Sequence, residues 1–230
     1  IGQVPDGPAS SMNRSVESTK AIPANLYKTP VDFTARQAIL TSTMWMLIGY
    51  VIVQFTAMQI MMNHQVSFLL DMGFSGASAA FAGGLFGAMT GASQLGVGFL
   101  GLRIKMHTLA VASVLFGIAG LIIILFARSM GIVILSNIFM GIGFGIQSIA
   151  LGNLIPDYFG RTEFPKMMGY TMPFTTFLSA AGTPVAGYIR EATGSYIPAF
   201  QFAIAVLALG LIFILLAKPP VHPSLKVKIN

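Results

Sequence analysis

Six long stretches of this 230-residue chain contain no Asp, Glu, Lys or Arg. Each stretch is 19 to 25 residues long. Crossing a hydrocarbon core of about 30 Å takes roughly 20 apolar residues in a helix, because the backbone amides must be satisfied within the segment itself. The sequence therefore predicts an all-α, polytopic membrane protein with six transmembrane helices, at Ala38–Met62, Ala77–Leu100, Thr108–Phe126, Gly131–Leu151, Met167–Ile189 and Ala199–Ala217.

The composition is typical of a membrane protein and limits the classes of molecule that it can be expected to bind. Hydrophobic residues make up 55% of the chain and charged residues only 9%, against about 25% charged in a soluble domain. Cysteine is absent, which excludes disulfides and thiolate metal sites. The net charge of +6 comes from basic residues scattered over short loops, so we expect membrane lipid as a partner rather than nucleic acid. No metal or cofactor is expected.

The Lys and Arg residues outside the spans predict the orientation. Eleven of them fall before the first span, in alternate loops and in the tail, and two fall in the opposite loops. Cytoplasmic loops carry the excess of Lys and Arg. We therefore expect a multi-pass protein of the plasma (inner) membrane with both termini in the cytoplasm. The eleven are Arg14, Lys20, Lys28, Arg36, Arg103, Lys105, Arg161, Lys166, Lys218, Lys226 and Lys228; the two are Arg128 and Arg190.

The flanks of the spans differ from the spans in composition. Residues 1–37 are rich in Pro and Ser without an apolar period and are predicted to form a flexible cytoplasmic segment. Thr34 is a plausible N-cap for the first helix. Residues 38–217 would form the transmembrane bundle and residues 218–230 a cytoplasmic tail. Gly152–Lys166 is predicted as a long loop, and because the chain opens at Ile1 without Met, further sequence is expected upstream.

Glycine and proline mark candidate contacts between helices. Glycines recur at every fourth position on the second and fourth spans. Such positions let helix backbones approach closely, for packing or for sliding. Pro184, just after Gly182, should bend or break the fifth span. The packing and gating candidates are Gly83, Gly87, Gly91, Gly141, Gly145 and Pro184.

Neutral polar side chains are the candidate ligand contacts, because the six spans contain no Asp, Glu, Lys, Arg or His. By depth, the ones nearest the bilayer midplane are Gln54, Thr90, Asn137 and Thr176. Transporter sites lie at that depth. The alternative is that each one bonds a neighbouring helix, an interaction worth about 0.6 kcal/mol in membrane proteins.

An enzymatic function is not predicted. Gly73-Phe74-Ser75-Gly76 has the Gly-x-Ser-Gly pattern of rhomboid-type proteases, but the last span contains no His to act as a base. Ser75 is better explained as the N-cap of the second span.

Four segments together resemble the major facilitator superfamily. His64–Ser75 is similar to the segment that closes helix seven of these transporters, and Gly98–Lys105 to their cytoplasmic Gly-x-x-x-Asp-Arg-x-Gly loop, through Gly98 and Arg103. Leu102 replaces the Asp of that motif. Pro156–Arg161 and Ala192–Phe200 resemble two later loops, and the combination is similar to the monocarboxylate and oxalate/formate exchangers.

The resemblance implies an architecture and a function. The six spans would be helices seven to twelve of a twelve-helix transporter, residues 1–37 its central loop, and its N-terminal six-helix half the partner. Such a secondary active transporter would move a small solute, such as a monocarboxylate, by alternating access. The alternative is a six-span module that oligomerises without transport.

Overall fold

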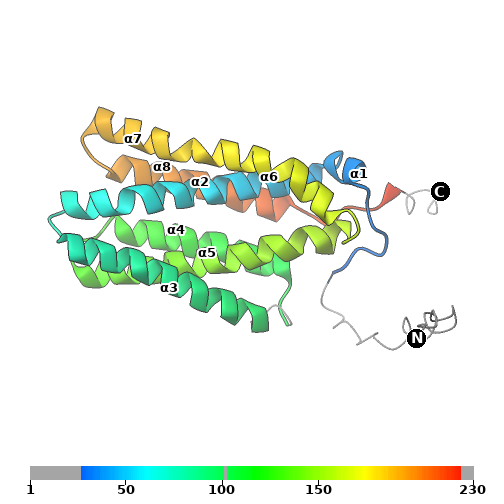
Figure 1. The fold of residues 1–230 in the computed structure, drawn as a ribbon, viewed down its shortest axis with the longest axis horizontal. Coiled ribbons are helices and arrows are strands. Elements are labelled where there is room, and N and C mark those ends of the chain that lie inside the picture. The colour runs from blue at the N-terminus through cyan, green and yellow to red at the C-terminus, as the bar shows by residue number, and fades with distance from the viewer. Residues whose placement is uncertain (1–26, 101–102, 224–230) are drawn as a thin grey trace, which may run out of the picture.

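The computed structural model describes residues 27–100 and 103–223. This part of the chain is helical (Figure 1). The helices in chain order are α1 (Ala35–Ile39), α2 (Ser42–Asp71), α3 (Gly76–Leu100), α4 (Met106–Ile124), α5 (Met130–Phe159), α6 (Phe164–Ala180), α7 (Gly182–Thr193) and α8 (Ile197–Leu216).

Four of the predicted spans are helices long and apolar enough to cross a membrane, namely α2, α4, α5 and α8. The second predicted span is also helical, as α3, but it is rich in glycine and carries Ser93 and Gln94. The fifth is divided between α6 and α7. The all-helical architecture is thus confirmed for the described residues.

The first span starts and ends later than the predicted Ala38–Met62. Thr34 is an N-cap, as predicted, but it caps only the short helix α1. The chain then turns, and Thr41 caps α2 by accepting a hydrogen bond from Met44 N. α2 continues past Met62 to Asp71, so most of the segment after His64 is helix. Ser75 caps α3, with its Oγ 3.2 Å from the amide nitrogen of Ser78.

The prediction of a long loop at Gly152–Lys166 is wrong. α5 extends through it to Phe159, with Pro156 inside its last turns. Gly160 then reverses the chain at φ +91°. A Cβ at this glycine would meet the carboxylate of Asp32, so both the backbone angle and the close contact require glycine here.

The fifth span, predicted as Met167–Ile189, is interrupted where its Gly and Pro residues stand. α6 ends at Ala180 and α7 begins at Gly182, with Ala181 between them. Pro184 lacks the amide hydrogen that would continue the helical bonding to Ala180. A Cβ at Gly182 would lie 2.8 Å from Thr56 Cγ2 on α2, so the break is packed closely against α2.

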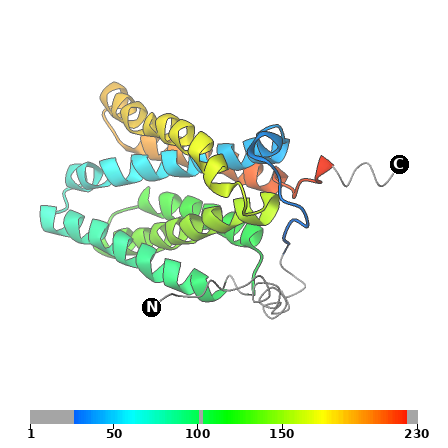
Figure 2. The ribbon, with the colours of Figure 1, turned by 45° about the vertical axis from the view of Figure 1, so that its right-hand side comes forward.

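Two helices organise the bundle. α2 contacts α3, α6, α7 and α8, and α5 contacts α3 and α4. Figures 1 and 2 place α6 and α7 on one side and α3 on the opposite side, with α2 and α5 between them. The two ends of the described chain lie at the same end of the bundle, because Tyr27 and Lys218 line one cavity and the ring of Phe33 packs on that of His222 (Figure 1).

A segment ahead of the first helix is fastened across that end of the bundle. Thr29 N donates to Asp157 O at 2.9 Å and Phe33 N to Phe159 O at 2.8 Å. Asp32 accepts hydrogen bonds from the amide and hydroxyl of Thr162. The Glu163 carboxylate accepts from Ala35 N at 2.6 Å. We call residues 29–35 the strap; residues 1–26 of the predicted flexible segment lie outside the described residues.

We expect the strap to be acid-sensitive. Hydrogen bonds from Thr162 lower the pKa of Asp32 below its ordinary value of 3.8, and the bond from Ala35 N lowers the pKa of Glu163 below 4.5. A lowered folded-state pKa stabilises the fold fully above the ordinary value and loses that effect as the pH falls through the lowered one. The protection factors of the Thr162 and Ala35 amides, which are exchange rates corrected for the intrinsic effect of pH, should therefore fall below about pH 4.

The variant Asp32→Asn should quicken exchange at Thr162 already at neutral pH. Asp71→Asn, a matched change at the far end of the bundle, should leave Thr162 unaffected. Equal exchange at Thr162 in all three proteins would contradict the role of Asp32.

Candidate functional site

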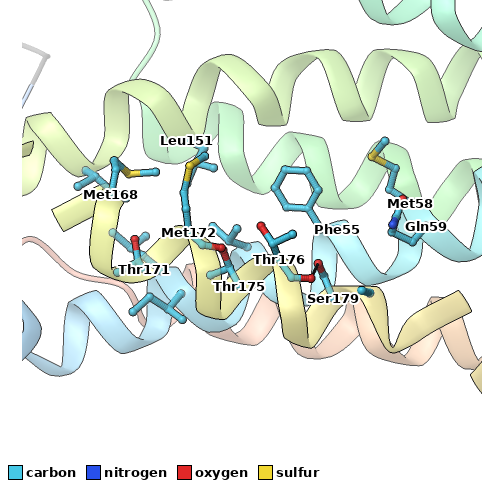
Figure 3. Close-up of a pocket in the computed structure, with 15 residues that line it drawn as sticks. Phe55, Met58, Gln59, Leu151, Met168, Thr171, Met172, Thr175, Thr176 and Ser179 are labelled. Carbon is cyan, nitrogen blue, oxygen red and sulfur yellow. Dashed lines mark hydrogen bonds between the residues drawn. The ribbon is translucent and has the colours of Figure 1, made fainter. Parts of the chain in front are cut away.

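A cavity of about 230 Å³ lies between α2, α5 and α6. Figure 3 shows side chains of these helices around it. Its lining is mostly apolar and includes Phe55, Met58, Met168 and Met172. No charged side chain lines it among the described residues. We call this the α6 cavity; a concave, mostly apolar space with few polar groups is typical of small-molecule sites.

The polar groups of the α6 cavity differ in their availability. Thr171, Thr175 and Ser179 donate to carbonyl groups of their own helix at 2.9 to 3.0 Å. The side chains of Gln59 and Thr176 make no hydrogen bond within the described part of the chain. Gln59 on α2 and Thr176 on α6 are therefore the polar side chains best placed to bind a ligand in this cavity (Figure 3).

The α6 cavity ends where the fifth span breaks. Ser179 and Ala180, the last residues before the break, belong to its lining. Beyond the break, Thr183 O lies 3.1 Å from His64 Nε2, and Arg190 forms a 2.9 Å ion pair with Asp71. α7 is thus held to the end of α2 separately from α6. In membrane transporters, substrate sites are typically formed at discontinuous helices.

A smaller cavity of about 30 Å³ lies deeper in the bundle, with Gln54, Ser113 and Gln147 in its lining. Ser113 Oγ donates to Ala110 O at 2.7 Å, which uses its hydrogen, so the Tyr50 hydroxyl donates to Ser113 at 3.0 Å. Gln54 Nε2 also donates to Ser113, at 3.2 Å. Gln147 is buried, and its Nε2 lacks a hydrogen-bond partner within the described residues. A space of this size has room for a water molecule.

The four predicted midplane residues do not share one site. Thr176 lines the α6 cavity, and Gln54 lines the small cavity. Asn137 is fully buried and lines neither; its amide accepts from Gln65 at 2.9 Å and donates to Val133 O. Thr90 also lines neither and donates to Phe86 O. Asn137 thus makes the bond to a neighbouring helix that was the alternative expectation, and so does Gln54, through Ser113 on α4. The bond of Thr90 stays within α3.

The predicted glycine faces have different environments. A Cβ at Gly141 would lie 2.8 Å from Phe86 O, and one at Gly145 would lie 2.5 Å from Thr90 O, so these two predicted glycines of α5 contact the α3 backbone. A Cβ at Gly83, Gly87 or Gly91 would meet no described atom within 4 Å. The glycine face of α3 is therefore open rather than packed on α5.

The remaining predicted residues lie apart from both cavities. Gly98 is open, and Arg103 is exposed after the end of α3. Pro184 stands in the first turn of α7, at the helix break.

Sequence reasoning missed the methionines of the α6 cavity and Ser113. Met168 and Met172 are one helical turn apart on the fifth span, a spacing that places them on one face. That spacing was a usable signal. No local sequence signal marks Ser113, because its hydrogen-bond partners Tyr50 and Gln54 lie 63 and 59 residues away in the chain.

Comparison with known proteins agrees with the helical membrane architecture. A search of curated proteins found no match for this chain. The family model described as Major Facilitator Superfamily matches residues 24–229, nearly the whole sequence. The chain is therefore a member of the Major Facilitator Superfamily of membrane transporters.

Proposed function

We propose that this chain is the second six-helix bundle of a secondary active transporter that moves a small solute by alternating access. The observation that carries the proposal is the α6 cavity, which ends at a helix break. Gln59 and Thr176 would bind the polar part of the solute. Phe55 and the methionines would bind its apolar part.

The proposed substrate class is supported by the apolar lining and by the resemblance of the sequence to carboxylate exchangers. A small organic anion such as a monocarboxylate has an apolar body that suits the α6 cavity. The described lining supplies no positive charge for its carboxylate. A buried charge requires a partner, so the cation would come from the other bundle.

The open glycine face of α3 supports a two-bundle arrangement. Small residues let a helix backbone approach another closely in a membrane, and Gly83, Gly87 and Gly91 have no described atom within that reach. We propose that the partner six-helix half docks here. In this arrangement the protein would lie in the plasma (inner) membrane, and the end of the bundle that carries both chain ends would face the cytoplasm.

Filling the α6 cavity should abolish transport. Thr176 is exposed and lines the cavity, so Thr176→Trp can occupy it without displacing a buried side chain. We expect uptake of radiolabelled lactate into proteoliposomes that contain both bundles to fall at least tenfold. The matched control is Leu209→Trp, at a position 45% exposed on α8, which should transport normally.

Two outcomes would contradict the proposal. Normal uptake by Thr176→Trp would exclude the α6 cavity as the transport site. If wild-type protein reconstituted with both bundles moved no solute, and the variant Gly87→Cys cross-linked to a second copy of itself, the alternative of an oligomeric module would be favoured.

A further inference from the structure

A cavity of about 430 Å³ lies at the end of the bundle that carries the described chain ends. The start of α4, the end of α5 and the end of α8 surround it, and it lies outside the α6 cavity. We call it the basic-end cavity. Its lining includes Lys105, His107, Asp157, Tyr158, Leu215 and Lys218.

Hydrogen bonds hold the walls of the basic-end cavity together. His107 Nε2 lies 2.8 Å from Ile214 O, which ties α4 to α8. The Tyr158 hydroxyl donates to Ala217 O at 3.3 Å, which ties α5 to the same turn. Thr43 donates to Lys218 O at 2.7 Å and fixes the backbone of that lysine. The cavity is therefore part of the folded bundle.

The charges around the basic-end cavity favour an anion. Lys105 and Lys218 are both exposed, so their ammonium groups are available. Asp157 is the one acid among the described lining residues, and it interacts electrostatically with Lys28 and Arg161, which offset its charge. Two lysines against one partly compensated carboxylate leave the cavity positive.

The surroundings of the cavity point to a lipid as the source of that anion. α8 is the most apolar of the four candidate spans, with mean hydropathy 2.7, and only 33% of its apolar window is buried within the chain. Leu215 in the cavity lining and Ile212 one turn earlier are both 53% exposed. Acyl chains can lie along these residues while a headgroup occupies the cavity. Basic pockets between helices at the cytoplasmic face bind anionic headgroups.

We propose that the basic-end cavity binds the phosphate group of an anionic phospholipid, with Lys105 and Lys218 as its cationic ligands. The acyl chains lie on the exposed face of α8. A bound lipid then bridges α4, α5 and α8, and it stabilises the bundle without contacting the transported solute.

The test uses the intact protein purified in detergent, with dioleoyl phosphatidylglycerol and dioleoyl phosphatidylcholine as probes. Native mass spectrometry gives the affinity for each lipid, and thermal unfolding gives the stabilisation. The double variant Lys105→Gln/Lys218→Gln should lose about 30-fold in affinity for phosphatidylglycerol, as expected for two lysines near an anionic headgroup. Its affinity for phosphatidylcholine should change little.

The matched control is Arg36→Gln/Lys166→Gln. It removes the same charge from the same end of the bundle, at exposed residues outside the basic-end cavity. We expect this control to keep most of the phosphatidylglycerol affinity. Equal losses in the two double variants would mean a non-specific surface effect and would overturn the proposal.

A third measurement distinguishes binding of a lipid headgroup from binding of a soluble anion. Inorganic phosphate at the same concentration should raise the unfolding temperature less than phosphatidylglycerol does. If phosphate stabilises the wild type as much, and Lys105→Gln/Lys218→Gln removes that effect, the cavity binds a soluble anion and the lipid assignment is wrong.

Discussion

Gly145→Ala should destabilise the bundle by about 1–3 kcal/mol, the usual effect of overpacking a well-packed site. The new Cβ would lie 2.5 Å from Thr90 O and 2.7 Å from Ser93 Cβ on α3. A backbone carbonyl cannot rotate away as a side chain can, so α3 and α5 must separate. Separation would also strain the 2.9 Å bond from Ser93 Oγ to Ile142 O. Thermal unfolding in detergent measures the loss, at about 2–4 °C per kcal/mol for a chain of this size.

The control for Gly145→Ala is Gly152→Ala on the same helix. A Cβ at Gly152 would meet nothing within 4 Å, and alanine is the better helix former. We expect no loss of stability for this variant. If both alanine variants unfolded at the same temperature as the wild type, the α3–α5 contact at Gly145 would be looser than the structure has it.

Ser113→Ala should cost a comparable amount, about 1–3 kcal/mol, because it leaves two buried donors without an acceptor. The Tyr50 hydroxyl and Gln54 Nε2 both donate to Ser113 Oγ, and all three side chains are buried. Single hydrogen bonds within membranes average only about 0.6 kcal/mol. The larger effect arises because one substitution orphans two donors. Thermal unfolding measures it.

A rescue experiment distinguishes orphaned donors from a simple loss of packing. Tyr50→Phe removes one donor, so adding it to Ser113→Ala should restore part of the stability. Non-additivity of this sign is expected for residues in one hydrogen-bond network. If the loss of stability in the double variant equalled the sum of the losses in the two single variants, the hydrogen-bond network would be contradicted.

The open face of α3 and the packed face of α5 show what a glycine pattern can and cannot predict. Both faces have glycines four residues apart, and the spacing correctly marks positions without side-chain bulk. The partner of each face depends on how the helices are arranged. Gly145 meets Thr90 O, whereas Gly87 meets no described atom.

The polar residues show the same limit. Depth along a span placed Gln54, Thr90, Asn137 and Thr176 in one layer, but the direction of each side chain is set by the rotation of its helix. Rotation follows from packing against helices remote in the sequence. Thr176 therefore lines the α6 cavity, whereas Asn137 bonds Gln65 on α2.

The sequence alone determined the membrane class, the approximate positions of the spans and the break near Gly182 and Pro184. These features are local, because a hydrocarbon core demands a minimum apolar length and proline removes a backbone donor wherever it stands. Only the tertiary structure decided the α6 cavity, the strap and the basic-end cavity. Each is built from residues of separate helices, whose contacts depend on how the whole bundle packs.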